Sequence, residues 1–273
     1  MSDTPVTAAP PAVRHVAEVN AVVLERLASP RLLIPLPFAT LHEYCDGGLA
    51  LGELVYLGAR PGAGKTVFAI ECARFAARRQ HKTLIVSREM TVEAVGERAL
   101  VQHGRKLIPG RKAGHVSADH LAFLAQTASY MAAWPLWYSD KILTVAQLHQ
   151  HLSTTTPPYQ FVILDYLQLL HPSAKKSSKR EEVEDISRGL MRVKLVDSVA
   201  LLVLSSSTRG KEGMELLRES GELEHDADLV WILSQDEKTR TYECQIKKNR
   251  NGRTGVMELD FHGEFLGFDE ATP

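Results

Sequence analysis

A glycine-rich turn between an apolar run and a helical stretch constrains the fold of this chain more than any other feature. Residues 59–66 read Ala-Arg-Pro-Gly-Ala-Gly-Lys-Thr. This is the pattern G-x-x-x-x-G-K-T, except that alanine holds the strict first position and Gly58 stands just before it. The glycines let the backbone curl so that its N–H groups point inward, and the helix that follows favours an anion at its N-terminus. The sequence therefore predicts a phosphate-binding loop between a strand and a helix.

The residue types within this loop indicate a nucleotide with a divalent cation. Lys65 can place a positive charge on the β- and γ-phosphates, and the Thr66 hydroxyl can bind Mg²⁺. The predicted ATP cradle comprises Arg60, Pro61, Gly62, Ala63, Gly64, Lys65 and Thr66. A chance glycine-rich turn is the alternative, but it would not explain a strand, a loop, Lys-Thr and a helix in this order.

Short apolar runs alternate with helical stretches after residue 50, which predicts an α/β fold around a mostly parallel sheet with helices on both faces. The expected strands are 53–58, 83–87, 160–165, 199–205 and 228–233. The expected helices are 65–79, 91–103, 117–132, 144–152 and 181–197. Two further strand-like runs, 241–248 and 255–261, flank Asn251-Gly252, a strong turn signal, and predict a C-terminal antiparallel hairpin.

The N-terminal segment differs in character from the rest. Residues 1–12 are rich in Pro, Ala and Thr, and we expect them to be disordered. Residues 13–28 place apolar side chains on one helical face, so residues 13–31 are predicted to form a linker helix before a domain at 32–273. The apolar face of this helix either packs on its own domain or docks on a neighbouring subunit.

Composition excludes several classes of protein. The formal net charge of −1 gives no global sign of a nucleic-acid partner, so any such binding needs a local basic patch. Three scattered cysteines form neither a disulfide framework nor a zinc site, which suits a reducing cytoplasm. With no long apolar run and no leader pattern, we expect neither a membrane span nor a secretion signal.

Two carboxylates are candidates for the second half of an active site. Phe161-Val-Ile-Leu-Asp165 is an apolar run that ends in one acid. We expect this strand to lie beside the loop strand, with Asp165 close to Mg²⁺ or its water. Glu89 follows the run 83–86 and is expected to point into the same crevice, where it could orient an attacking water. The structural alternatives are a turn residue for Asp165 and a helix N-terminal acid for Glu89.

Several segments together resemble the C-terminal RecA-like ATPase domain of DnaB-type replicative helicases, in family order from about residue 32 to 268. The matching segments are 59–66, Ser87-Arg-Glu-Met90, Pro135-Leu-Trp137, Asp165-Tyr-Leu-Gln-Leu169, Leu217-Arg-Glu-Ser-Gly221, Glu224-His-Asp-Ala-Asp228 and Lys248-Asn-Arg-Asn-Gly252. The family's separate helical N-terminal domain has no counterpart in this sequence. The helix at 13–28 stands in its place and resembles the family's linker helix.

This resemblance implies a role for each matching residue. Glu89 corresponds to the catalytic glutamate and Asp165 to the Mg²⁺-associated aspartate, while Lys248 and Arg250 correspond to a basic pair that reaches the neighbouring subunit's nucleotide. An arginine supplied in trans can be worth ~10³–10⁵ in rate. Single-stranded DNA would contact two segments in the channel of a homo-hexamer. The residues concerned are Lys175, Lys176, Lys179 and Arg180, expected in a loop, and Arg218, Glu219 and Gly221.

The sequence departs from the family pattern at two positions. Ser206 replaces a glutamine thought to sense the γ-phosphate, and Arg88 replaces an apolar residue beside Glu89. We expect Arg88 either to pair with Glu89 or to point to solvent. Three readings of the function remain: an ATP-dependent DNA helicase with primase or loader partners, a RecA-like ATPase switch that does not unwind DNA, and a structural ring subunit without turnover. The intact acids argue against the last.

Overall fold

The computed structural model describes residues 15–206, 221–236, 239 and 241–271. Contacts divide the chain into two units, Met1–Leu32 and Leu33–Pro273, and each is described by itself. In the first unit, α1 (Val16–Ala28) is a helix whose N-cap is His15, and its large apolar side chains are exposed. The segment 1–12, predicted to be disordered, lies outside the described residues.

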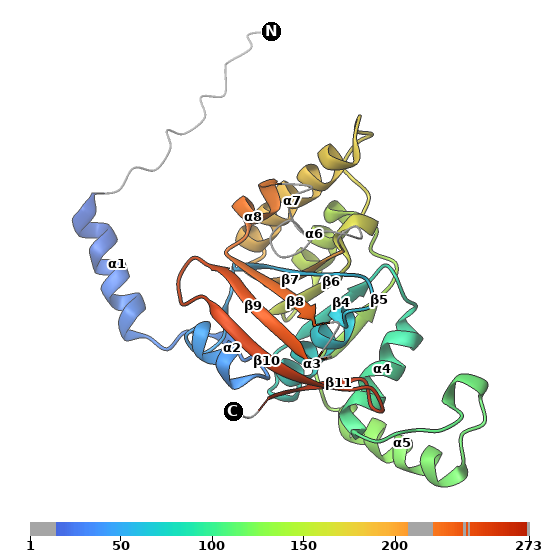
Figure 1. The fold of residues 1–273 in the computed structure, drawn as a ribbon. Coiled ribbons are helices and arrows are strands. Elements are labelled where there is room, and N and C mark those ends of the chain that lie inside the picture. Colours follow the sequence, from blue (N-terminus) through green and yellow to red (C-terminus); the bar gives the residue numbers. More distant parts are fainter. Residues whose placement is uncertain (1–14, 207–220, 237–238, 240, 272–273) are drawn as a thin grey trace. The chain divides into compact units, whose positions relative to one another are not determined.

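A nine-stranded sheet forms the centre of the second unit (Figure 1). Its order is β11-β10-β9-β8-β3-β7-β6-β4-β5. The neighbours from β8 to β5 pair in parallel, whereas β8, β9, β10 and β11 pair antiparallel in succession. The strands are β3 (Leu54–Ala59), β4 (Thr83–Ser87), β5 (Leu136–Ser139), β6 (Phe161–Asp165), β7 (Ala200–Ser206), β8 (Leu229–Gln235), β9 (Tyr242–Asn249), β10 (Gly255–His262) and β11 (Gly267–Glu270). The predicted fold class is confirmed.

Helices cover both faces of the sheet, because successive side chains of its central strands point to opposite sides. Val55 and Leu57 of β3 share one core cluster with Phe68 of α3, whereas Leu54 and Tyr56 belong to a second cluster with residues of α6 and α7. The helices are α2 (Ala39–Tyr44), α3 (Lys65–Arg78), α4 (Val92–Gly104), α5 (Ala118–Met131), α6 (Val145–Thr154), α7 (Lys179–Val196) and α8 (Gly221–Asp226). Short elements complete the fold: β1 (Leu33–Ile34), β2 (Leu49–Ala50) and 3-10 turns at Arg111–Ala113 and Leu167–Leu169. No helix within the described residues is long and apolar enough to cross a bilayer.

The expected position of the Asp165 strand is wrong in one respect. β6 does not lie beside the loop strand β3, because β7 pairs with both of them and separates them. Asp165 still reaches the phosphate-binding loop, since α3 begins at the loop and packs over β6 and β7 as well as β3. Sequence order alone cannot reveal which strand a crossover inserts between two others.

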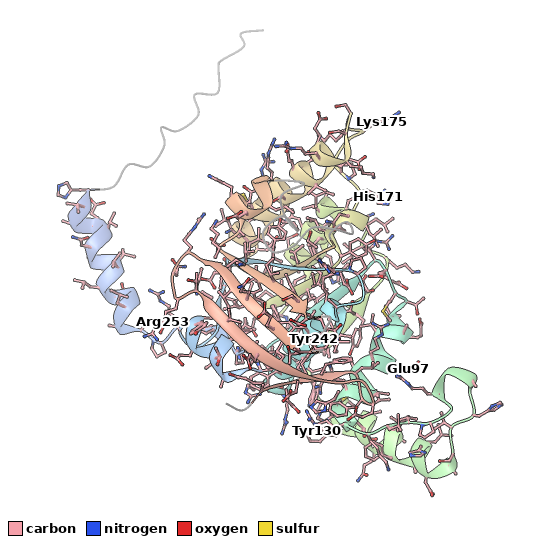
Figure 2. All side chains as sticks on the ribbon, in the orientation of Figure 1. Glu97, Tyr130, His171, Lys175, Tyr242 and Arg253 are labelled. Atoms are coloured by element: carbon pink, nitrogen blue, oxygen red, sulfur yellow. The ribbon has the colours of Figure 1, made fainter. Side chains whose placement is uncertain are left out.

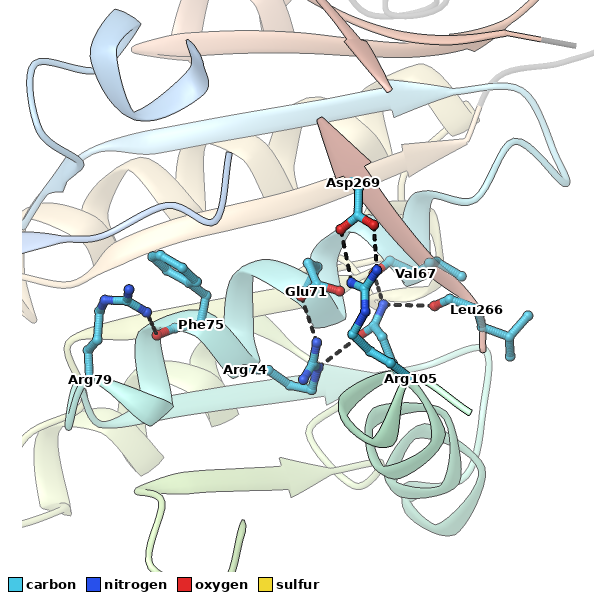
Figure 3. Close-up of polar contacts among 9 residues, drawn as sticks. Val67, Glu71, Arg74, Phe75, Arg79, Arg105, Leu266 and Asp269 are labelled. Carbon is cyan, nitrogen blue, oxygen red and sulfur yellow. Dashed lines mark hydrogen bonds and ion pairs between the residues drawn. The ribbon is translucent and has the colours of Figure 1, made fainter. Parts of the chain in front are cut away.

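The C-terminal strand β11 packs against α3 and joins the elements around it. Gln102 of α4 is 1% exposed; its side-chain amide donates to the carbonyls of Val67 and Leu266, and its carbonyl oxygen accepts from Arg74. Figure 3 shows the contact that reaches Leu266, the contact between Arg74 and Glu71 on α3, and the ion pair between Arg105 and Asp269. Hydrogen bonds therefore fix α3, α4 and the β10–β11 turn to one another.

Candidate active site

The phosphate-binding loop lies between the end of β3 and the start of α3. Gly62 and Gly64 have φ angles of 82° and 88°, in the left-handed region that glycine adopts without strain. At Gly64 a Cβ would also lie 2.9 Å from Cζ of Phe268 on β11, so a side chain there would clash with the core. The loop thus has a curled backbone that β11 supports from behind, as a phosphate cradle requires.

Lys65 is folded back onto the loop. Its Nζ donates to the carbonyl oxygens of Ala59 at 3.2 Å and Arg60 at 3.4 Å. Burial lowers the pKa of Lys65, and the negative charges of Asp165 and Glu89 oppose that shift. The ammonium group is therefore held at the mouth of the loop, next to the two acids that the sequence predicted for the site.

Thr66 and Asp165 meet at the start of α3. The Thr66 hydroxyl donates to Oδ2 of Asp165 at 2.7 Å, and Asp165 is only 3% exposed. Burial raises the pKa of the Asp165 carboxyl, while the hydrogen bond from Thr66 acts in the opposite direction. Its other oxygen, Oδ1, is buried without a hydrogen-bond partner among the described residues. A hydroxyl next to a carboxylate with an unpartnered oxygen is a ligand set that fits Mg²⁺.

Glu89 lies two residues beyond the end of β4 and is exposed. Burial raises the pKa of both Asp165 and Tyr166, and the negative charge of Glu89 adds to both shifts. The neighbouring Arg88 follows neither expectation. It donates from Nη1 to the Asp140 carbonyl at 2.5 Å, across the end of β5, so its guanidinium is directed to the backbone there.

The predicted basic pair lies at the other end of the sheet from the cradle. Lys248 donates to the carbonyl oxygens of Glu224 at 2.6 Å and His225 at 3.3 Å, at the C-terminal end of α8. Arg250 pairs with Asp228, whose carboxylate also accepts from the main chain of Leu54. Leu54 is the first residue of β3, and the phosphate-binding loop follows the last residue of that strand. The basic pair and the loop are therefore separated by the length of β3, roughly 16 Å.

The four cationic residues after β6 are less available for binding DNA than the sequence suggested. Lys179 and Arg180 form the first turn of α7 rather than a loop, because Ser178 caps that helix by accepting from the main chain of Glu181. Three of the cations pair with acids of α7. The pairs are Lys176 with Asp185, Lys179 with Glu182 and Arg180 with Glu184, at 2.9, 2.7 and 2.7 Å. Lys175 is exposed at the tip of this connection (Figure 2).

Most of the second segment predicted to bind DNA lies outside the described residues. Arg218 and Glu219 lie outside the described residues, and Gly221 is the first residue of α8. The backbone of Ser206 pairs with Ala59, and the preceding Ser205 accepts a hydrogen bond from Gln168 at 2.9 Å. Position 206 therefore stands beside the strand that carries the loop.

Two residues near these sites were missed from sequence. Phe268 packs against Gly64, but its strand has only four residues, and these mix apolar and acidic side chains too closely to indicate a strand. Asp228 anchors Arg250, and it was quoted only as part of the segment Glu224-His-Asp-Ala-Asp228. The available signal was an acid directly before an apolar run.

Comparison with known proteins identifies the family of this domain. The profile described as DnaB-like helicase C terminal domain matches residues 34–270. The replicative DNA helicase DnaB of Leifsonia xyli subsp. xyli (strain CTCB07) is 28% identical over 258 residues, which cover 88% of this chain and 56% of that protein. The replicative DNA helicase DnaC of Bacillus subtilis (strain 168) is 28% identical over 255 residues, covering 86% and 56%. The chain spans about half the length of the curated relatives it matches.

Solved structures show the same architecture. A DnaB-like replicative helicase, described with its interactions with primase, superposes with a TM-score of 0.84 at 26% identity, covering 93% of this chain and 68% of that chain. A second structure, described as an ATPase domain, gives a TM-score of 0.86 at 25% identity, covering 96% and 100%. The similarity therefore extends over the whole sheet and the helices that flank it.

Proposed function

This chain belongs to the DnaB-like helicase C-terminal domain family, and from that premise we propose that it is the ATP-hydrolysing motor of a ring-shaped DNA helicase. The observation that carries the proposal is the separation of two half-sites. A complete cradle with Thr66 and Asp165 lies at one end of the sheet, and the cations Lys248 and Arg250 lie at the other. A site that needs both is completed between two copies of the chain, as in a homo-hexamer.

Each residue has a defined task in ATP hydrolysis. The loop N–H groups and Lys65 would bind the phosphates, and Thr66 and Asp165 would hold Mg²⁺, which would supply positive charge to offset the charge that develops in the transition state. Glu89 orients the attacking water and accepts its proton, a role that its exposed position beside Asp165 supports. Arg250 of the next subunit, with Lys248, stabilises the transition-state charge.

The translocating strand would be single-stranded DNA held by its backbone. Lys175 is the strongest candidate contact of its segment, because Lys176, Lys179 and Arg180 share their charge with acids of α7. Arg218, Glu219 and Gly221 form the second candidate segment. Each DNA phosphate that the protein neutralises contributes roughly −0.7 to the slope of the logarithm of the binding constant against the logarithm of the salt concentration. A primase or a helicase loader is the expected protein partner, and the cytoplasm is the expected compartment.

A second function, a RecA-like ATPase switch that does not unwind DNA, is favoured by position 206. Serine there lacks the amide with which the family's glutamine is thought to sense the γ-phosphate. Such a protein would hydrolyse ATP and change its affinity for DNA or a protein partner without separating strands.

Turnover and unwinding distinguish these functions when they are measured together. We expect oligonucleotide single strands to raise the rate of ATP hydrolysis at low salt and a forked duplex to be opened. Glu89→Gln should bind ATP yet hydrolyse it ~10²–10⁴-fold more slowly, as expected for loss of a general base. DNA-stimulated turnover without unwinding would favour the switch. Turnover that DNA leaves unchanged would contradict the helicase.

A further inference from the structure

Asp228, the residue before β8, is hydrogen-bonded to the first residue of the neighbouring strand β3. It is 7% exposed, so its charge needs partners. Its main-chain N–H donates to the carbonyl of Leu54, and its Oδ2 accepts from the N–H of Leu54, both at 2.9 Å. Its own carbonyl accepts from the N–H of Arg250 at 2.9 Å. Asp228 therefore links Arg250 directly to the first residue of β3.

Two cations share the Asp228 carboxylate unequally. Lys194 of α7, itself 5% exposed, contacts Oδ2 closely, whereas Nη1 of Arg250 lies 3.4 Å from Oδ1. The second distance exceeds the ~2.7–2.9 Å of a strong charge-assisted hydrogen bond. The Arg250 side chain is 54% exposed. The single negative charge is thus taken mainly by Lys194, and the Arg250 guanidinium is oriented without being neutralised.

A purely structural role for Asp228 would not require this arrangement. Its Oδ2 already accepts from Leu54 and pairs with Lys194, which balances the buried charge. The additional ion pair from Oδ1 to a half-exposed arginine adds little to stability. The contact with Arg250 is made through both the main chain and the guanidinium, which fixes where that side chain leaves the sheet. These contacts orient a cation that is partly exposed at the surface of its own subunit.

We propose that Asp228 is a positioning residue that aims Arg250 at the nucleotide of the neighbouring subunit, while Lys194 prevents the carboxylate from neutralising that arginine. This inference rests on the proposed function, because it takes Arg250 to act across a subunit boundary. The nucleotide cradle of the same subunit, at the far end of β3, is not involved.

The test variant is Asp228→Asn/Lys194→Met. The asparagine oxygen can still accept from Leu54, and no unpaired charge is left in the core, as it would be in Asp228→Asn alone. We expect ATP turnover to fall roughly ten- to a hundred-fold, as for a displaced catalytic group, with the KM for ATP and the thermal midpoint little changed. Arg253→Ala is the matched control. It removes a cation from the same hairpin, one that pairs with Glu43 on the surface, and should keep full turnover.

Mixed rings show where the defect acts. Lys65→Ala loses the phosphate-binding lysine but keeps an intact Arg250, so co-assembly with Arg250→Ala should restore turnover above that of either variant alone. The Asp228→Asn/Lys194→Met chain should be rescued by Lys65→Ala in the same way. A defect in the variant's own cradle would not be rescued, since the Lys65→Ala neighbour supplies no working cradle.

The mixtures also separate failure of this inference from failure of the proposed function. If Arg250→Ala and Lys65→Ala do not complement each other, the shared site itself is wrong. If they do, but the Asp228 variant stays inactive in the mixture or is fully active alone, only the positioning role of Asp228 is overturned. Rescue restricted to mixtures with Lys65→Ala supports it.

Discussion

The ionised carboxylate of Asp165 destabilises the folded protein, because it is buried and incompletely hydrogen-bonded. Its carboxyl is buried, one oxygen accepts from Thr66, and the other has no hydrogen-bond partner among the described residues. Burial raises the pKa of this carboxyl above its usual 3.8, so the fold disfavours the ionised form. The penalty is absent at low pH, where folded and unfolded chains are both protonated, and is complete above the folded-state pKa. A bound cation would remove it.

Asp165→Asn should therefore stabilise the nucleotide-free protein while impairing its function. We expect the thermal midpoint at pH 7 to rise by a few degrees and the gain to vanish as the pH falls to about 3. Asp185→Asn is the control, and we expect it to lower the thermal midpoint at pH 7. Although burial opposes it, hydrogen bonds from Ser173 and the contact with Lys176 lower the pKa of Asp185 to about 2. A midpoint of Asp165→Asn that is unchanged or lower at pH 7 would contradict the argument.

Single residues were predictable where local pattern determines their chemistry. Lys65 and Thr66 follow from the loop, and Asp165 from an apolar run that ends in one acid. Arg88 was not predictable, because its acceptor is the carbonyl of Asp140, which follows β5 and lies far along the sequence. The ion pair of Lys176 was missed for a related reason, since its partner Asp185 lies nearly two turns into the next helix.

At the scale of elements, the helix that carries the cradle is held by its neighbours as well as by the sheet. Gln102 joins α4 to α3 and to the β10–β11 turn, and Phe268 of β11 lies against Gly64. The long helices and central strands were predictable from periodicity to within a few residues. β5 and β11 were not, because each has four residues and takes its strand conformation from the neighbour it pairs with.

Gln102→Leu should destabilise the fold by about 1–3 kcal/mol, the cost of leaving buried polar groups unpaired. The change removes partners from Arg74 Nε and from the carbonyls of Val67 and Leu266. Arg79→Ala, which removes an exposed side-chain bond to Phe75 on the same helix (Figure 3), should stay within about 0.5 kcal/mol of wild type. Urea unfolding measures both. Equal effects would mean that Gln102 is not a structural junction.

Phe268→Leu should weaken nucleotide binding as well as stability. A smaller side chain no longer supports the curled backbone at Gly64, so we expect a higher KM for ATP together with a loss of about 1–2 kcal/mol in unfolding free energy. Phe265→Leu is the matched control. It alters a buried ring in a separate small cluster and should lower stability while leaving the KM unchanged. A KM raised equally by both changes would indicate general loosening.

At the scale of the whole molecule, the proposed nucleotide site and the apolar face of α1 both lack a partner surface within their own described unit. The cradle and the basic pair lie at opposite ends of β3. In its own unit, α1 has exposed apolar side chains at Val16, Val19, Val23 and Leu27. A surface helix of this kind buries its stripe against a partner. Neither which partner it packs on nor how subunits meet is encoded in local pattern.

Removal of residues 1–32 should leave the second unit folded and weaken the ring. We expect the 33–273 chain to keep the thermal midpoint of the full-length protein, measured without nucleotide, because its core lies within that unit. Sedimentation with ATP should shift to smaller species, and turnover should fall with it. Undiminished assembly would place the apolar stripe of α1 on its own domain instead.

The contact between Phe268 and Gly64 also has a consequence for biosynthesis. A ribosome that has finished the glycine-rich turn must add roughly 200 further residues before the aromatic ring behind it exists, and a domain generally folds as a unit. Until then, the emerging polypeptide has a turn without its backing. Nucleotide capture should therefore be a late event of synthesis, which spares an unfinished chain from engaging ATP before the rest of its sheet has closed.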